Sequence, residues 1–93
     1  MKVTLRTFAD FREIIGVREK ELSLPEEESV GGLLKDLCEV HPGLRGKLFN
    51  AAGEIKPYIL VLKNGRNIAS LQQLDTVLAD RDVISLFPPV AGG

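Results

Sequence analysis

This 93-residue sequence is short of the residue types that build disulfides, metal sites and nucleic-acid surfaces. It has one cysteine, Cys38, and one histidine, His41, so it cannot form an internal disulfide, and a tetrahedral zinc site would need several carboxylates as well. The formal net charge is −1, whereas a nucleic-acid-binding surface usually requires a basic excess. We therefore expect neither a bound metal nor a nucleic-acid partner.

Long apolar stretches are also missing. The longest run, residues 58–62, is far shorter than the roughly 20 apolar residues that a membrane-spanning helix needs. The first six residues alternate in polarity like a strand and lack the apolar region of a signal peptide. We therefore expect a cytoplasmic protein with no membrane partner.

What the sequence contains is sufficient for one folded domain, with 44% hydrophobic and 27% charged residues. Alternating polarity predicts strands, and apolar spacings of three and four predict a helix between an N-cap at Ser29 and a stop at Pro42. Asn64-Gly65 predicts a tight hairpin. In chain order, we expect a strand at 2–8, a helical turn at 9–15, a strand at 18–24, the main helix, a helical turn within 44–53, and strands at 58–63, 66–69 and 82–87. This order fits an α+β fold with one main helix packed across a mixed sheet.

The main helix has an apolar face that we expect to lie in the core. Cys38 falls on this face, which predicts a buried thiol; a nucleophilic thiol assisted by His41, three positions further on, is the weaker alternative. Gly31 and Gly32 weaken the first turn by up to ~1 kcal/mol each relative to alanine. Nothing in the sequence explains these two glycines.

The last seven residues are the most informative part of the chain: Phe87-Pro88-Pro89-Val90-Ala91-Gly92-Gly93. The prolines stiffen the exit from the last strand, and the glycines, which have no Cβ, can enter a narrow cleft. We predict a folded domain at 1–87 and a flexible tail at 88–93, in which Gly92 presents the reacting carboxylate of Gly93. The alternative is a frayed terminus without chemistry.

An exposed apolar patch is expected beside this tail. Residues 58–62 are apolar on both faces of their strand, whereas a sheet covered by one helix needs only one apolar face. Phe8 and Phe87 fall in the outward phase of the first and last strands. The predicted partner-binding residues are Phe8, Tyr58, Leu60, Phe87, Pro88, Pro89 and Val90, unless loops cover them.

Several motifs resemble the MoaD/ThiS family of ubiquitin-like sulfur carriers. They are Phe8-Ala9-Asp10-Phe11-Arg12-Glu13, His41-Pro42, Val61-Leu62-Lys63-Asn64-Gly65 and the stretch from Asp82 to Gly93. The resemblance covers essentially the whole chain, and it is closest to archaeal small modifier proteins (SAMP) and molybdopterin synthase small subunits. It implies a β-grasp, ubiquitin-like fold.

The resemblance also implies a carrier rather than an enzyme. An E1-like enzyme of the MoeB/ThiF/UbaA type would adenylate Gly93 with ATP-Mg, and the chain itself would bind no cofactor. The activated Gly93 would become a thiocarboxylate or be joined to lysines of target proteins. A dedicated molybdopterin synthase small subunit, acting with its large subunit, and a non-reacting ubiquitin-like interaction module remain as alternatives. We expect a monomer when the protein is free.

Two positions depart from the family pattern. Arg81 stands before Asp82 where the family usually has glycine, so the turn before the last strand is expected to differ. Gly31 and Gly32 replace the usual stronger helix formers. Neither departure touches the tail.

Overall fold

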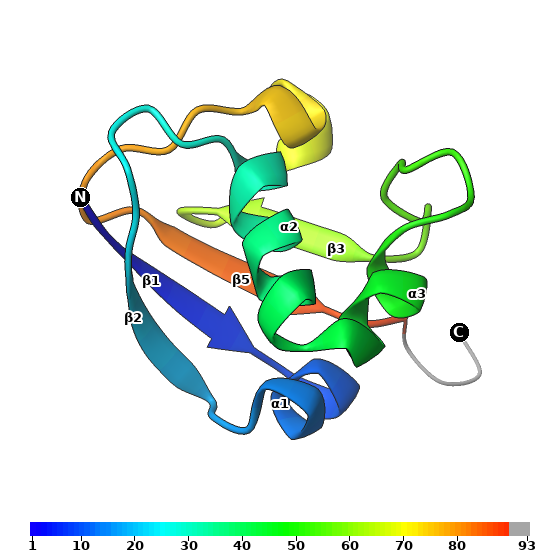
Figure 1. Ribbon diagram of the computed structural model, residues 1–93. Helices are drawn as coiled ribbons and strands as arrows, with labels where there is room; N and C mark the ends of the chain where they lie inside the picture. The colour runs from blue at the N-terminus through cyan, green and yellow to red at the C-terminus, as the bar shows by residue number, and fades with distance from the viewer. Residues whose placement is uncertain (90–93) are drawn as a thin grey trace.

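Five strands form one mixed sheet in the computed structural model, which describes residues 1–89 of the chain (Figure 1). The order across the sheet is β2-β1-β5-β3-β4, and α2 lies across one face. The strands are β1 (Lys2–Thr7), β2 (Glu19–Ser23), β3 (Leu60–Lys63), β4 (Arg66–Asn67) and β5 (Val83–Phe87). This is the α+β architecture that the sequence predicts.

The first and last strands lie side by side in the middle of the sheet. β1 pairs with β5 in parallel, with Leu5 opposite Ile84 and Thr7 opposite Leu86. The other three pairs, β1 with β2, β3 with β5 and β3 with β4, are antiparallel. Because β1 and β5 run in the same direction, their C-terminal ends lie side by side. The residues that follow the two strands therefore emerge at the same place.

The main helix, α2 (Val30–Val40), begins and ends where the sequence predicts. The Ser29 hydroxyl accepts a hydrogen bond from the Gly32 amide at 3.0 Å, which satisfies one of the free donors of the first turn. At the other end, the His41 amide donates to the Leu37 carbonyl at 2.8 Å, immediately before Pro42. Proline disfavours helical conformation in the residue before it, so the helix stops there.

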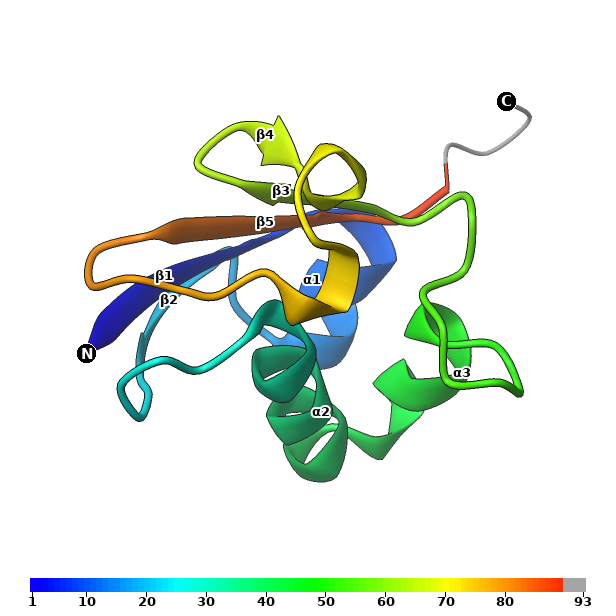
Figure 2. The ribbon, with the colours of Figure 1, turned by 90° about the horizontal axis from the view of Figure 1, so that it is seen from above.

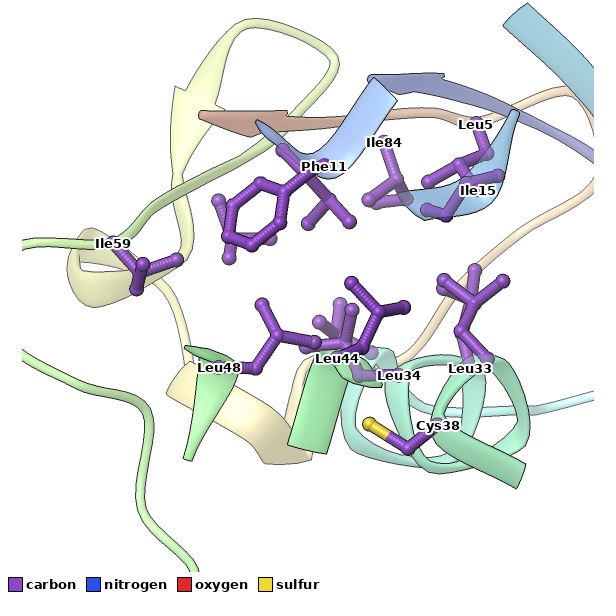
Figure 3. Close-up of a cluster of buried hydrophobic side chains, with 14 of the residues drawn as sticks. Leu5, Phe11, Ile15, Leu33, Leu34, Cys38, Leu44, Leu48, Ile59 and Ile84 are labelled. Atoms are coloured by element: carbon purple, nitrogen blue, oxygen red, sulfur yellow. The ribbon is translucent and has the colours of Figure 1, made fainter. Parts of the chain in front are cut away.

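The core lies between α2 and the sheet (Figure 3). Leu5 and Ile84 from the sheet face Leu33 and Leu34 from α2, and all four side chains are fully buried. Phe11, from α1 (Ala9–Ile15), belongs to the same core cluster and is 1% exposed. The remaining helical turns, which Figure 2 shows from above, are η1 (Pro42–Leu44), α3 (Arg45–Leu48), η2 (Ile68–Ser70) and η3 (Gln73–Asp75). None of the helices within residues 1–89 has the length and apolar character needed to cross a membrane.

The structure supplies a reason for Gly31. A Cβ at this position would lie 3.1 Å from the Leu74 carbonyl oxygen and 3.2 Å from the Leu74 Cβ, because η3 packs against the first turn of α2. At Gly32 a Cβ would meet only the carboxylate of Glu28, at 2.0 Å, and that flexible side chain can move away. Gly31 therefore permits a close approach of two backbones, whereas Gly32 does not serve that purpose.

The hairpin is confirmed, and the strands around it are shorter than predicted. Asn64 and Gly65 have φ of 51° and 84°, as a type I′ turn requires. β3 begins at Leu60 rather than at Tyr58, and β4 ends at Asn67 rather than at Ala69. The Asn67 side chain accepts a hydrogen bond from the Ala69 amide at 2.9 Å, which turns the chain out of the strand into η2.

A buried carboxylate holds the turn at the start of β5, at the end of the strand away from the tail. Asp82 is 7% exposed, and its two oxygens accept hydrogen bonds from the Asn64 amide side chain and the Ala79 main chain, both at 2.8 Å. Lys63 lies 3.6 Å from the same carboxylate. The preceding residue, Arg81, has φ of 71°, the left-handed conformation that glycine adopts most easily.

Candidate functional site

Two aromatic rings mark the point where the tail leaves the sheet. Thr7 and Leu86 form the last pair between β1 and β5, so Phe8 and Phe87 come next to each other. Their rings are stacked, with centroids 4.2 Å apart and an angle of 11° between the planes. The parallel register of the two central strands thus brings together residues that are far apart in the sequence.

The stacked rings line a groove that continues across β3. Leu60 lies directly opposite Phe87 in the β3–β5 pair, and Tyr58 extends from the segment before β3 with 79% of its surface exposed. The groove has a volume of about 650 Å³. We call it the tail-root groove. Its lining residues are Phe8, Ala9, Asp10, Tyr58, Leu60, Phe87, Pro88 and Pro89.

The segment from Ile59 to Leu62 is apolar on both faces, and the structure shows where each face lies. Ile59 and Val61 are buried in the core beneath α2. Leu60 and Leu62 are half-buried on the open side of the sheet, which α2 does not cover. The second apolar face is therefore available beside the tail, as the sequence predicts.

Six of the predicted site residues meet in one place. Phe8, Tyr58, Leu60, Phe87, Pro88 and Pro89 all line the tail-root groove. Val90, Gly92 and Gly93 lie outside the described residues. The role of the groove in binding a partner stays a prediction.

One ion pair stands on the wall of the otherwise largely apolar groove. Lys47 of α3 lies 3.7 Å from the carboxylate of Asp10, and both side chains are at least half exposed. An exposed pair of this kind contributes only about 0–1 kcal/mol to stability. Its main effect is to place one negative and one positive charge at the edge of the apolar surface.

Sequence reasoning missed Ala9 as part of the site. Ala9 lines the groove between Phe8 and Asp10, and its φ is 50°, in the left-handed region. Glycine or asparagine would have suggested such a conformation, but alanine does not. The only indication in the sequence is that Ala9 separates a predicted strand from a predicted helical turn.

The thiol of Cys38 is confirmed as a core group. Its side chain is 3% exposed, and burial raises the pKa of the Cys38 thiol, an effect that the nearby Arg45 guanidinium only partly offsets. A nucleophilic cysteine needs the opposite change, a lowered pKa. Within residues 1–89, no three His, Cys, Asp or Glu side chains are grouped in a way that could hold a metal ion.

The strand order and the helix across one face define a β-grasp protein of the ubiquitin-like class. The crystal structure of SAMP1 from Haloferax volcanii has the same fold: it superposes with a TM-score of 0.85 at 33% identity, covering 100% of both chains. The family model of the ThiS family matches residues 5–93. The chain therefore belongs to the ThiS family.

Curated relatives agree with this assignment. The small archaeal modifier protein 3 of Haloferax volcanii is 43% identical over 93 residues, which is 100% of both chains. The human molybdopterin synthase sulfur carrier subunit is 30% identical over 92 residues, which is 99% of this chain and 94% of the human one. The chain is thus related over its whole length both to protein modifiers and to sulfur carriers.

Proposed function

We propose that this protein is a ubiquitin-like modifier and sulfur carrier whose Gly93 carboxylate is activated by an E1-like enzyme. The observation that carries the proposal is the tail-root groove, an apolar surface at the base of a segment that ends in Gly92-Gly93. The match to the ThiS family continues to Gly93, so the diglycine belongs to the region shared with the family. In this proposal the chain is a substrate of its partners and not itself an enzyme.

Activation is needed because a carboxylate is a poor acyl donor. One oxygen of the Gly93 carboxylate attacks the α-phosphorus of ATP, pyrophosphate leaves, and an acyl-adenylate forms. A sulfur nucleophile, or the amine of a lysine, then attacks the carbonyl carbon and AMP leaves. Attack by the terminal sulfur of a persulfide gives an acyl disulfide, and a thiol reductant then cleaves its S–S bond to release the thiocarboxylate. A lysine amine instead loses a proton and gives an isopeptide bond. Dividing one difficult step in two is the logic of covalent catalysis.

The residues of this chain bind and orient rather than catalyse. Phe8, Phe87 and Tyr58 are aromatic side chains of the kind that is enriched in protein interfaces, and tyrosine is also frequent among the residues that dominate binding energy. When they dock on the E1-like enzyme, Pro88 and Pro89 direct the tail toward its active site. We propose that the partner supplies ATP and Mg²⁺, and that the reaction takes place in the cytoplasm, where ATP is available.

Intact-mass spectrometry tests this function. The full chain is incubated with an E1-like enzyme of its host, ATP-Mg, a persulfide donor and a thiol reductant, and a variant without Gly92-Gly93 serves as the control. Exchange of one oxygen for sulfur at Gly93, absent in the truncated variant, is the expected result. ATP-dependent adenylation of the truncated variant would contradict the proposal.

A second candidate is a dedicated small subunit of molybdopterin synthase. The observation that favours it is the similarity to the human sulfur carrier subunit over 99% of this chain. Size-exclusion chromatography with a molybdopterin synthase large subunit, and isopeptide-linked remnants of the C-terminal segment after Arg81 on lysines of cellular proteins, separate the two functions. A stable complex without remnants indicates the subunit, remnants indicate the modifier, and neither product indicates a non-reacting interaction module.

A further inference from the structure

The segment that carries Phe8 is held at both ends. On one side, the buried Thr7 hydroxyl donates a hydrogen bond to the Val17 carbonyl, and the Thr7 amide donates to the Arg18 carbonyl at 2.9 Å. On the other side, Phe11 is 1% exposed in the core. Only three residues lie between these two fixed points.

The chain must change from extended to helical conformation within those three residues. Phe8 is extended, with φ of −135° and ψ of 148°, and its carbonyl already accepts hydrogen bonds from the amides of Phe11 and Arg12 at 3.2 and 3.5 Å. Ala9, with φ of 50°, makes the turn between the two conformations. A residue with a Cβ persists in the left-handed region only where its surroundings fix it there.

The strained residue stands next to the ring that covers the root of the tail. Phe8 stacks on Phe87, and Ala9 lines the same groove. A Cβ confines a left-handed residue to a small region of backbone conformation, whereas glycine samples a much wider region at positive φ. With glycine at position 9, the backbone would be freer and the Phe8 ring could leave Phe87. The substitution removes only one methyl group, so the change in side-chain contacts is small.

We propose that Ala9 is a positioning residue of the tail-root groove: its restricted left-handed backbone holds the Phe8 ring on Phe87. The consequence is a docking surface that is already ordered before the partner binds. Ordering a side chain during association weakens binding, so a preformed stack favours recognition. This consequence for recognition rests on the proposed activation by an E1-like enzyme, whereas the placement of the ring does not.

The chain offers a matched control for the test. Gln73 has φ of 53°, nearly the same as that of Ala9, is also exposed, and does not line the tail-root groove. Gln73→Gly and Ala9→Gly therefore remove the same kind of backbone strain at two different places. Ala9→Asn is the conservative variant, because asparagine keeps a Cβ and tolerates the left-handed conformation.

The first measurement is made on the free protein by NMR. In Ala9→Gly we expect the nuclear Overhauser contacts between the Phe8 and Phe87 rings to weaken at least twofold, while the urea midpoint of unfolding is unchanged or higher. Gln73→Gly and Ala9→Asn should keep these contacts. Full retention of the contacts in Ala9→Gly, or their equal loss in Ala9→Asn, would overturn the inference, whatever the E1-like enzyme does.

The second measurement is the rate of pyrophosphate release by the E1-like enzyme at varied carrier concentration. We expect Ala9→Gly to raise KM about three- to tenfold with kcat unchanged, as the loss of one preordered aromatic side chain implies. Gln73→Gly should leave both constants unchanged. An unchanged KM in Ala9→Gly, despite a lost ring stack, would overturn the role in recognition. No activity with the wild-type chain would instead reject the proposed function and leave the NMR result standing.

Discussion

Replacing Tyr58 with alanine separates docking from folding more cleanly than any other change in the tail-root groove. Tyr58 is 79% exposed, so its truncation should alter the free energy of unfolding by no more than about 0.5 kcal/mol. If the ring is an anchor for the E1-like enzyme, its loss should weaken docking by about 2 kcal/mol, which is roughly thirtyfold in KM. Phe8→Ala would be harder to interpret, because it also removes the stack on Phe87.

Val40 provides the control for this prediction. It is 70% exposed at the end of α2 and does not line the groove, so Val40→Ala removes exposed apolar surface elsewhere. The assay is pyrophosphate release by the E1-like enzyme at varied concentration of wild type, Tyr58→Ala, Tyr58→Phe and Val40→Ala. Tyr58→Phe and Val40→Ala should stay close to wild type. A change of less than twofold in Tyr58→Ala, or an equal change in Val40→Ala, would refute the assignment of this groove as the docking surface.

Three further predictions concern stability. Gly31→Ala should destabilise the fold by about 1–2 kcal/mol in urea, because its Cβ would press on the Leu74 backbone, whereas Gly32→Ala should gain up to about 1 kcal/mol; equal effects would contradict the close-approach explanation. Asp82→Ala should lower the free energy of unfolding by about 1.5–3 kcal/mol, since it removes the charged acceptor of two part-buried hydrogen bonds, and a loss below 1 kcal/mol would count against that network. Because burial raises the pKa of the Cys38 thiol above that of an unfolded thiol, the neutral thiol stabilises the fold fully below the pKa of the unfolded thiol, and this contribution is lost as the pH rises through the folded pKa. Cys38→Ala should therefore show a smaller loss of stability than wild type between neutral and strongly alkaline pH, and identical slopes would refute the assignment.

The elements that the sequence predicts well are those determined by local patterns. Ser29 and Pro42 delimit α2 because capping and proline geometry act within a few residues. Phe8 and Phe87 could be assigned to the outward face because side chains alternate along a strand. The diglycine end and its resemblance to a known family supplied the chemistry, which the fold alone does not define.

The features that escaped prediction depend on contacts between distant parts of the chain. The reason for Gly31 lies in Leu74, more than forty residues away, whose backbone comes close only in the folded state. The left-handed Ala9 results from two fixed points on either side of it, the clamp at Thr7 and the buried Phe11, and not from its own preference. β4 is shorter than its alternating sequence suggests because Asn67 caps a helical turn.

The central position of β5 has a mechanical consequence for any protein to which this carrier is attached. β5 leads into the tail and lies between β1 and β3, hydrogen-bonded on both sides. β1 and β5 run in parallel, so a force pulling the start of the chain and the tail in opposite directions loads their hydrogen bonds together, in shear. An unfolding machine that pulls on a conjugate through this end must rupture the middle of the sheet at once, since neither β1 nor β5, the strands that bear the load, lies at an edge of the sheet.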